Sequence, residues 1–110
     1  MSHFSEVRAA FAAALSAVDG VRGFEKKPVS RQVGDAWPAW ASGTHVTGGA
    51  YSELGWTVYV YLPSDDDARD TWISGHLTEL TEALLPVAWV DGAAPGTVDD
   101  QPVLTFTCRE

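Results

Sequence analysis

The stretch "GWTVYVYLPSDDDARDTW", residues 55–72, predicts a strand that runs almost directly into the start of a helix. In its first half, bulky apolar residues alternate with threonine and tyrosine, the two-residue period of a strand with one buried face. We expect the core face to carry Trp56, Val58, Val60 and Leu62. The opposite face is then either partly solvated or a surface that meets another chain; its side chains are Thr57, Tyr59 and Tyr61.

Three aspartates in a row follow this strand, and their setting predicts a helix start. Ser64 stands directly before them, and an aspartate lies three residues after it, an arrangement similar to a capping box. Acidic side chains in a first turn also complement the positive end of the helix dipole. A calcium-binding loop would need an oxygen ligand and a glycine where this run has Arg69 and Asp70. We therefore expect a helix over residues 65–85, stopped by Pro86, and neither a metal site nor an acid–base pair.

The remaining elements follow from apolar periodicity and from the positions of glycine and proline. An amphipathic helix is expected over residues 3–18, with Gly20 placed for a left-handed C-cap. Pro38 restricts its strand to a sheet edge or a bulge, because proline cannot donate a ladder hydrogen bond. The other expected elements are strands at 21–29, 34–46, 86–91 and 101–109, a turn at 47–50 and a loop at 92–100.

These elements, in the order α-β-β-β-α-β-β, predict the fold class. Short connections between consecutive strands favour a mostly antiparallel sheet, and the single apolar stripe of each helix favours two helices packed on one face. We therefore expect an α+β fold. A chain of 110 residues suits a single domain, and we assign residues 1–110 to it.

The net charge of −8 is distributed unevenly along the chain. Residues 1–31 hold five basic and three acidic side chains, a balance of +2, whereas residues 32–110 hold two basic and twelve acidic ones, a balance of −10. An acidic body repels nucleic acid, because binding requires basic side chains that neutralise phosphates. The charge suits either a protein partner of complementary charge or a solvated surface that aids solubility.

Cysteine content and hydropathy suit a soluble protein of a reducing compartment. The single cysteine, Cys108, cannot form an internal disulfide, and its place on the apolar face of the last strand suits a buried hydrophobic residue. No apolar run approaches the roughly 18 residues that a membrane span needs, and the first helix lacks the apolar core of a signal peptide. We expect synthesis in a cytoplasm and no membrane association.

The sequence contains little that is typical of catalysis. Of the three histidines, only His76 has a ligand-like neighbour, Glu79 at i+3, and a zinc site needs three or four ligands. No serine elbow, phosphate-binding loop or dinucleotide-binding fingerprint follows a strand. We expect no enzyme activity and neither a metal nor a cofactor.

Two groups of residues are candidates for contacts with a partner. The first is a basic group in an otherwise acidic chain, and it consists of Arg22, Lys26, Lys27 and Arg31. This group is either a contact surface or a solvated strand and loop. The second group is Trp37 and Trp40. Tryptophan is enriched in interface hot spots, but paired tryptophans in a hairpin are equally typical of a core.

The order of features along the whole chain resembles the tail terminator (head–tail joining) proteins of long-tailed phages, especially those of actinobacteria. The resembling segments are an alanine-rich opening helix followed by "GVRGF", then "GDAWPAW", "GWTVYVYLPSDDDARDTWISGHLTELTEALLPVAWVD" and "PVLTFTCRE". The strongest part is a strand ending in Leu-Pro-Ser, an acidic start to a helix with aromatic residues, and a Pro-terminated helix leading into "VAWVD".

The resemblance implies a structural role in a virion. Proteins of that family form a hexameric ring on the head-proximal end of the tail tube, end tube polymerisation and offer a surface to the head connector. It implies no catalytic residues, and the partners would be other copies of the chain, the tail tube protein and the head connector protein. We expect tube or connector contacts at the 43–53 hairpin and the 92–100 loop, because these segments are glycine-rich and connect strands. The alternatives are another head–tail connector or neck component and a small protein-interaction domain without a phage connection.

Overall fold

The computed structural model describes residues 3–45 and 51–110, and the side chains of residues 3–43 and 54–110. Within these residues, two helices and five strands follow one another as α1 (His3–Ser16), β1 (Arg22–Gly23), β2 (Asp35–His45), β3 (Tyr51–Tyr61), α2 (Asp66–Leu84), β4 (Trp89–Val98) and β5 (Gln101–Arg109). The predicted α+β class and the order α-β-β-β-α-β-β are confirmed. The turn expected at 47–50 lies outside the described residues.

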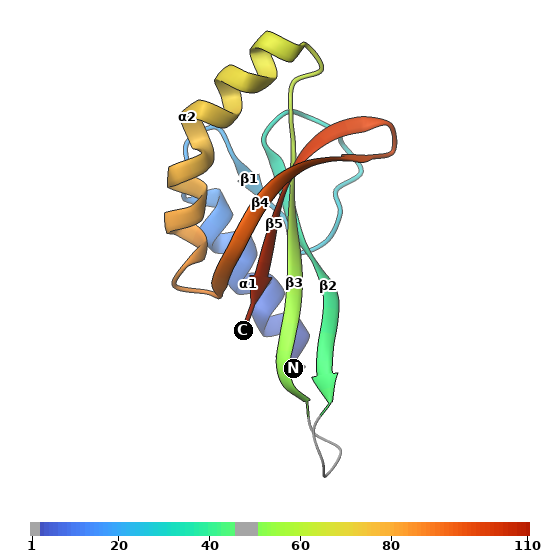
Figure 1. The fold of residues 1–110 in the computed structure, drawn as a ribbon, viewed down its shortest axis with the longest axis vertical. Helices are drawn as coiled ribbons and strands as arrows, with labels where there is room; N and C mark the ends of the chain where they lie inside the picture. Colours follow the sequence, from blue (N-terminus) through green and yellow to red (C-terminus); the bar gives the residue numbers. More distant parts are fainter. Residues whose placement is uncertain (1–2, 46–50) are drawn as a thin grey trace.

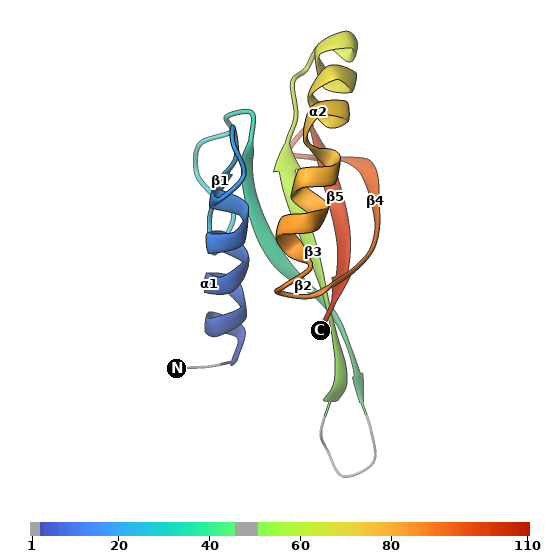
Figure 2. The same cartoon turned by 90° about the vertical axis from the view of Figure 1, so that its left-hand side faces the viewer.

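The strands of the described residues form one sheet in the order β1-β2-β3-β5-β4. Neighbouring strands are antiparallel, except that the two-residue β1 runs parallel to β2. Both helices pack against the same face of this sheet, as Figures 1 and 2 show and as the sequence predicts. One face of the sheet is therefore covered by the two helices, and no helix of the described residues covers the other face.

The main hydrophobic core lies between the helices and the face of β3 that the alternation predicts. All four expected residues are buried there: Trp56, Val58, Val60 and Leu62. The helices contribute Val7, Phe11 and Leu15 from α1 and Leu80 and Leu84 from α2. The Trp56 ring lies against the rings of Phe4 and Phe11, at centroid distances of 5.1 and 5.8 Å. Burying a large apolar side chain in such a cluster contributes about 1.5–3 kcal/mol.

The aspartate run begins α2, as the sequence predicts, but the capping residue is Asp65 and not Ser64. Asp65 has an extended backbone, with φ −74° and ψ 134°, and its Oδ2 accepts a hydrogen bond from the N–H of Ala68 at 3.0 Å. The expected serine cap is wrong because the carboxylate one residue later reaches a free N–H of the first turn and also carries the charge that the dipole favours. The Ser64 carbonyl instead accepts a hydrogen bond from Arg69 Nη2 at 2.8 Å.

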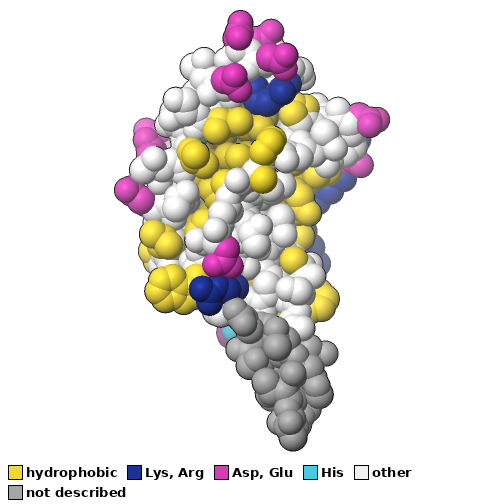
Figure 3. Space-filling view, in the orientation of Figure 1, with side chains coloured by type: hydrophobic (Ala, Val, Ile, Leu, Met, Phe, Trp, Pro, Cys, Tyr) yellow, Lys and Arg dark blue, Asp and Glu magenta, His cyan; other side chains and the backbone are white. Residues whose placement is uncertain are grey.

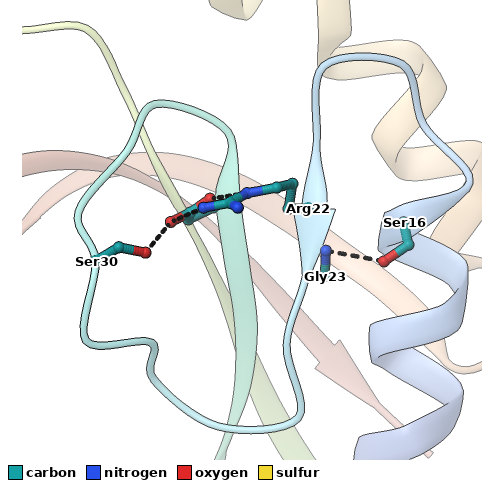
Figure 4. Close-up of polar contacts among 5 residues, drawn as sticks. Ser16, Arg22, Gly23 and Ser30 are labelled. Atoms are coloured by element: carbon teal, nitrogen blue, oxygen red, sulfur yellow. Dashed lines mark hydrogen bonds and ion pairs between the residues drawn. The ribbon is translucent and has the colours of Figure 1, made fainter.

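The expected strand over residues 21–29 is wrong, because only Arg22–Gly23 pairs in the sheet. Gly23 lies so close to α1 that a Cβ atom there would be 2.1 Å from a backbone oxygen of that helix. Its N–H donates to Ser16 Oγ at 3.0 Å (Figure 4). We call residues 24–34 the basic loop. Its ends still make backbone hydrogen bonds to the sheet, from Phe24 N–H to the Ala36 carbonyl and from Gly34 N–H to the Tyr61 carbonyl, and the residues between them leave the sheet. Side-chain contacts with residues distant in the sequence replace ladder hydrogen bonds along this loop.

The expected loop over residues 92–100 is also wrong, because most of it belongs to β4, which pairs with β5. The strand expected at 86–91 begins only at Trp89, since a turn follows α2. Gly92 adjoins a β-bulge and Pro95 lies in an outermost strand, two places where a sheet tolerates these residues. Glycine and proline content therefore does not mark a loop at this sheet edge.

A two-residue turn joins β4 to β5, and both of its residues have a left-handed backbone, with φ 50° at Asp99 and 63° at Asp100. Positive φ at both central residues is the geometry of a type I′ turn, whose twist matches that of the flanking strands. Aspartate tolerates this region better than most residues, although less readily than glycine. The turn places the Asp99 carboxylate at the tip of the hairpin.

The first helix ends slightly earlier than expected. It stops at Ser16 rather than at residue 18. Gly20 has the expected left-handed φ of 81°, but it lies in a turn closed by the hydrogen bond from Val21 N–H to the Val18 carbonyl, so the expected C-cap role is wrong. In the part of the chain that the structure describes, no helix is both long enough and apolar enough to cross a membrane.

Each of the two long outer strands contains a proline. Pro38 lies at a sheet edge, as predicted, because β1 covers only the first two residues of β2. The N–H of Phe24 donates to the Ala36 carbonyl, so Ala36 directs its backbone groups away from β3, and Pro38 two residues later does the same. Alternation across β3 and β5 likewise directs the backbone of Pro95 away from β5. Neither proline therefore removes a hydrogen bond from the sheet.

Candidate interaction surface

A second, smaller hydrophobic cluster lies on the face of the sheet opposite the helices. Its buried members are Trp37, Tyr61 and Val103, with Phe24, Tyr59 and Val98 partly buried around them. Trp37 stacks on Tyr59 with ring centroids 5.3 Å apart, and only 4 % of its surface is exposed. The chain itself thus covers part of the face that the sequence leaves as solvated or as a contact with another chain. Trp37, a candidate contact residue, offers little surface to a partner.

The buried carboxylate of Asp35, at the start of β2, is contacted by side chains from two segments (Figure 4). Arg22 donates from Nε to Oδ1 at 2.9 Å and from Nη2 to Oδ2 at 3.1 Å, and Ser30 Oγ donates to Oδ2 at 2.9 Å. The hydrogen bonds to Asp35, together with its charge, raise the pKa of Arg22. A bidentate arginine–carboxylate pair fixes both partners in orientation. Arg22 therefore anchors β1 and the basic loop to β2.

The carboxylate of Asp99, at the tip of the β4–β5 hairpin, contacts two more of the predicted basic residues. Lys27 Nζ donates to Asp99 Oδ2, and Arg31 Nη2 lies 3.9 Å from the same oxygen. The hydrogen bond from Lys27, with the charges of Lys27 and Arg31, lowers the pKa of Asp99. These contacts join the basic loop, beside β1 and β2, to the β4–β5 hairpin at the opposite edge of the sheet, across the second hydrophobic cluster. Lys27 and Arg31 are therefore also engaged within the chain.

Two of the predicted contact residues remain open to solvent. Lys26 is exposed and has no ion pair within the part of the chain that the structure describes. Trp40, at the outer edge of β2, keeps 46 % of its surface exposed, with its ring 5.8 Å from that of Phe4. Val29 and Val33 are also exposed on the basic loop. The outer surface of this loop therefore combines exposed valines with the unpaired Lys26 and its unpaired neighbour Glu25, rather than four free basic charges.

The outer side of α2 is acidic. Its exposed acidic residues are Asp66, Asp67, Asp70, Glu79 and Glu82. The basic residue of this helix is Arg69, whose Nη1 lies 3.1 Å from Asp66 Oδ1. Figure 3 shows acidic side chains gathered over the beginning of α2 and again along its outer side. The unpaired charges on α2 are therefore acidic, whereas the basic loop has one unpaired base, Lys26, and one unpaired acid, Glu25, among the described residues.

An apolar depression lies where α2 ends and the chain turns into β4. Its volume is about 480 Å³, and it is lined by Leu85, Pro86, Val87, Ala88, Trp89 and Glu110. Leu85 and Trp89 keep 49 % and 65 % of their surface exposed. Hydrophobic side chains gather over this connection at the lower left of Figure 3. Exposed aromatic and aliphatic side chains beside a depression are typical of a protein contact site.

Sequence reasoning does not find this depression, because residues 85–89 are interpreted as the end of a helix followed by a strand. The one available signal is Leu85. It falls outside the apolar stripe of α2 and stands directly before Pro86, so it cannot continue the buried face.

Cys108, His3 and His76 each contact other residues of the chain in ways that are typical of structural roles. Burial, with an acidic neighbour, raises the pKa of Cys108 to about 11, which keeps the side chain a thiol at neutral pH. His3 Nε2 lies 2.7 Å from Glu110 Oε1, and the ring of His76 stacks on that of Trp72 at 4.0 Å. Among residues 3–43 and 54–110, no group of three or more His, Cys, Asp or Glu side chains could hold a metal ion.

No protein-family model matches this chain, and no curated protein is significantly similar to it. The candidate site is consequently defined by the surfaces alone: an acidic helix with an apolar depression at its end, and an anchored basic loop with exposed valines. Such an arrangement can bind a protein through apolar contact and complementary charge.

Proposed function

We propose that this chain is a structural subunit of a long-tailed phage virion, which caps the head-proximal end of the tail tube as a ring. It would end tube polymerisation and offer a surface to the head connector. The observation that carries this proposal is the pair of unlike surfaces on one small domain. The resemblance of the ordered sequence segments to tail terminator proteins supports it. The role requires neither a catalytic group nor a cofactor.

Unlike surfaces favour a ring over a twofold dimer. In a ring, each copy presents one surface to the copy before it and a different surface to the copy after it. A twofold dimer through α2 would instead place the acidic residues of one helix near the same residues of the other, and like charges repel. Unlike surfaces at separate places on the molecule therefore support head-to-tail association.

The far ends of β2 and β3 are the segment that we assign to the tail tube. β5 pairs with β3 only as far as Gly55, whereas β2 and β3 continue to pair up to His45 and Tyr51. The two strands extend beyond the rest of the sheet in Figures 1 and 2. A two-stranded ribbon is marginally stable by itself in water, which favours its stabilisation by a partner.

Native mass spectrometry over a range of protein and salt concentrations, with negative-stain images of the largest species, tests this proposal. We expect a ring of six copies that weakens as salt increases, because screening reduces the attraction between charged surfaces. If the chain forms rings only on a template, images of its mixture with tail tubes of the encoding phage should show capped ends.

Two results would contradict the proposal. A chain that stays monomeric and leaves tube ends uncapped would indicate a small protein-interaction domain. A ring that binds the head connector but not the tube would indicate another neck component.

A further inference from the structure

Val29 is the most exposed of the large apolar side chains in the described residues, at 102 % of its reference surface. A single exposed valine is common on a surface loop, but here the chain is anchored on both sides of it. Ser30 donates to the buried carboxylate of Asp35, and Lys27 pairs with Asp99. The structure therefore presents this apolar side chain on a fixed support, which lowers the entropic cost of binding.

The depression at the end of α2 has the chemistry to receive such a side chain. Five of its six lining residues are apolar, and its volume of about 480 Å³ exceeds what one valine fills, leaving room for the adjoining backbone. Trp89 forms part of its wall and remains largely exposed in the single chain. Tryptophan in a partly enclosed apolar site is a frequent centre of binding energy.

Lys26 and Glu82 place one pair of opposite charges beside the two sites, and the exposed carboxylate of Glu25 lies next to Lys26. Lys26 lies three residues before Val29 and is unpaired among the described residues. Glu82 lies three residues before Leu85, on the same side of α2, and is exposed and equally unpaired in the described part of the chain. A valine entering the depression would bring this lysine toward an acidic helix surface rather than a basic one.

We propose that neighbouring copies of this chain join by docking Val29 of one copy into the depression at the end of α2 of the next, with Lys26 facing Glu82. This inference rests on the proposed function, since it names the two surfaces through which the ring would close. The basic loop and the α2–β4 connection lie well apart in both Figure 1 and Figure 2, so one copy can use both at once. A contact between two different surfaces repeats from copy to copy and can close into a ring.

A mixing experiment tests the docking directly. The Val29→Asp variant keeps its depression, and the Trp89→Asp variant keeps its valine, so each alone should lose self-association by roughly 30-fold or more. Mixed together, the two variants should form a one-to-one heterodimer and nothing larger, because only one intact contact remains. Sedimentation velocity and native mass spectrometry measure both results. Failure of the mixture to associate would overturn the inference.

Matched controls separate docking from misfolding. Val33→Asp places the same charge on the same loop at another exposed valine, and it should assemble like the wild type. Equal losses in the Val29 and Val33 variants would assign the effect to loop charge and overturn the inference. Circular dichroism should show unchanged folding for all three variants, because the replaced side chains are exposed.

Charge exchange tests the pairing of Lys26 with Glu82. Lys26→Glu and Glu82→Lys should each weaken assembly at low salt by roughly 2- to 5-fold, the usual effect of one exposed ion pair. The double variant K26E/E82K should recover wild-type assembly, because every contact then again holds one acid and one base. A double variant weaker than either single variant would contradict this part of the docking.

The outcomes distinguish the docking from the function. Rings or capped tubes formed equally well by the Val29→Asp and Trp89→Asp variants would overturn the docking and leave the tail role intact. A heterodimer from the mixed variants, together with a wild type that never caps tubes, would support the docking and contradict the tail role.

Discussion

The two faces of the sheet are closed in different ways. On one face, α1 and α2 bury a continuous apolar cluster that includes Phe11, Trp56 and Leu84. On the other, three buried residues are covered by the basic loop and the tip of the β4–β5 hairpin, which ion pairs from Lys27 and Arg31 to Asp99 hold together. Helices close the first face through apolar burial, whereas the second combines a smaller apolar cluster with charged contacts.

This difference predicts how each face responds to change. Apolar burial is large and depends little on pH or salt, whereas exposed ion pairs contribute little and weaken when salt screens them or a carboxylate is protonated. The helix-covered face should therefore determine the free energy of unfolding. The loop-covered face should respond more to solution conditions.

The largest expected effect is on the helix-covered face. Phe11→Ala removes a fully buried ring and leaves a cavity beside Trp56, so the free energy of unfolding should fall by about 3–5 kcal/mol. Urea denaturation followed by tryptophan fluorescence measures this loss. Ala9→Ser, at an exposed position of the same helix, is the control and should change stability by less than about 0.5 kcal/mol. A loss for Phe11→Ala no larger than that of the control would remove the distinction between the faces.

The next effect is a gain on the loop-covered face. The Tyr61 hydroxyl is buried without a hydrogen-bond partner in the described residues, so it loses its hydration without compensation. Tyr61→Phe should therefore raise the free energy of unfolding by about 1 kcal/mol. The same urea titration measures it, and a clear loss of stability would mean that an ordered water completes the hydroxyl's hydrogen bonding.

A smaller gain is expected at the hairpin tip. Asp100→Gly relieves a left-handed backbone at φ 63° and should stabilise the chain by about 0.5 kcal/mol, since glycine is preferred in type I′ turns. Thermal unfolding measures the shift. Asp99→Gly relieves a similar backbone but removes the partner of Lys27 and Arg31, so it should stabilise less than Asp100→Gly. If Asp99→Gly stabilised the chain more than Asp100→Gly, the ion pairs to Lys27 and Arg31 would contribute nothing to the stability of the loop-covered face.

The smallest effect is a pH dependence of the loop-covered face. Because the pKa of Asp99 is lowered in the folded chain, its contribution is complete above the ordinary value of 3.8 and is lost as the pH falls through the lowered value. The stability difference between the wild type and Asp99→Asn should therefore be larger at about pH 6 than at about pH 2. Urea titrations at both pH values test this, and an equal difference would exclude Asp99 as the source.

The sequence predicts the helix-covered face better than the loop-covered face. The alternation from Trp56 to Leu62, the aspartate run and the edge position of Pro38 are local signals, and each correctly places an element of the helix-covered face. The basic loop and β4 are not predictable in this way, because pairing and contacts between distant residues determine them. Lys27 and Asp99, for example, are 72 residues apart.

In the candidate site, too, the sequence predicts the local features and misses those that depend on contacts between distant residues. Charge alone identifies the basic residues but does not show that Arg22, Lys27 and Arg31 are used inside the chain, because their partners Asp35 and Asp99 become neighbours only on folding. The sequence also does not predict the depression that Leu85 and Trp89 line, because its lining residues follow no periodic pattern. The fold is therefore more readable from the sequence than the surfaces that would carry the function.

The outward-facing prolines of the two long outer strands limit how copies of this chain can associate. A sheet grows without limit when its edges offer unbroken rows of donors and acceptors, which is how amyloid-like stacking begins. Pro38 and Pro95 each remove a donor from the middle of such a row. Edge-to-edge growth is thereby disfavoured at high local concentration, and association is left to side-chain surfaces, whose shape can stop at a finite number of copies.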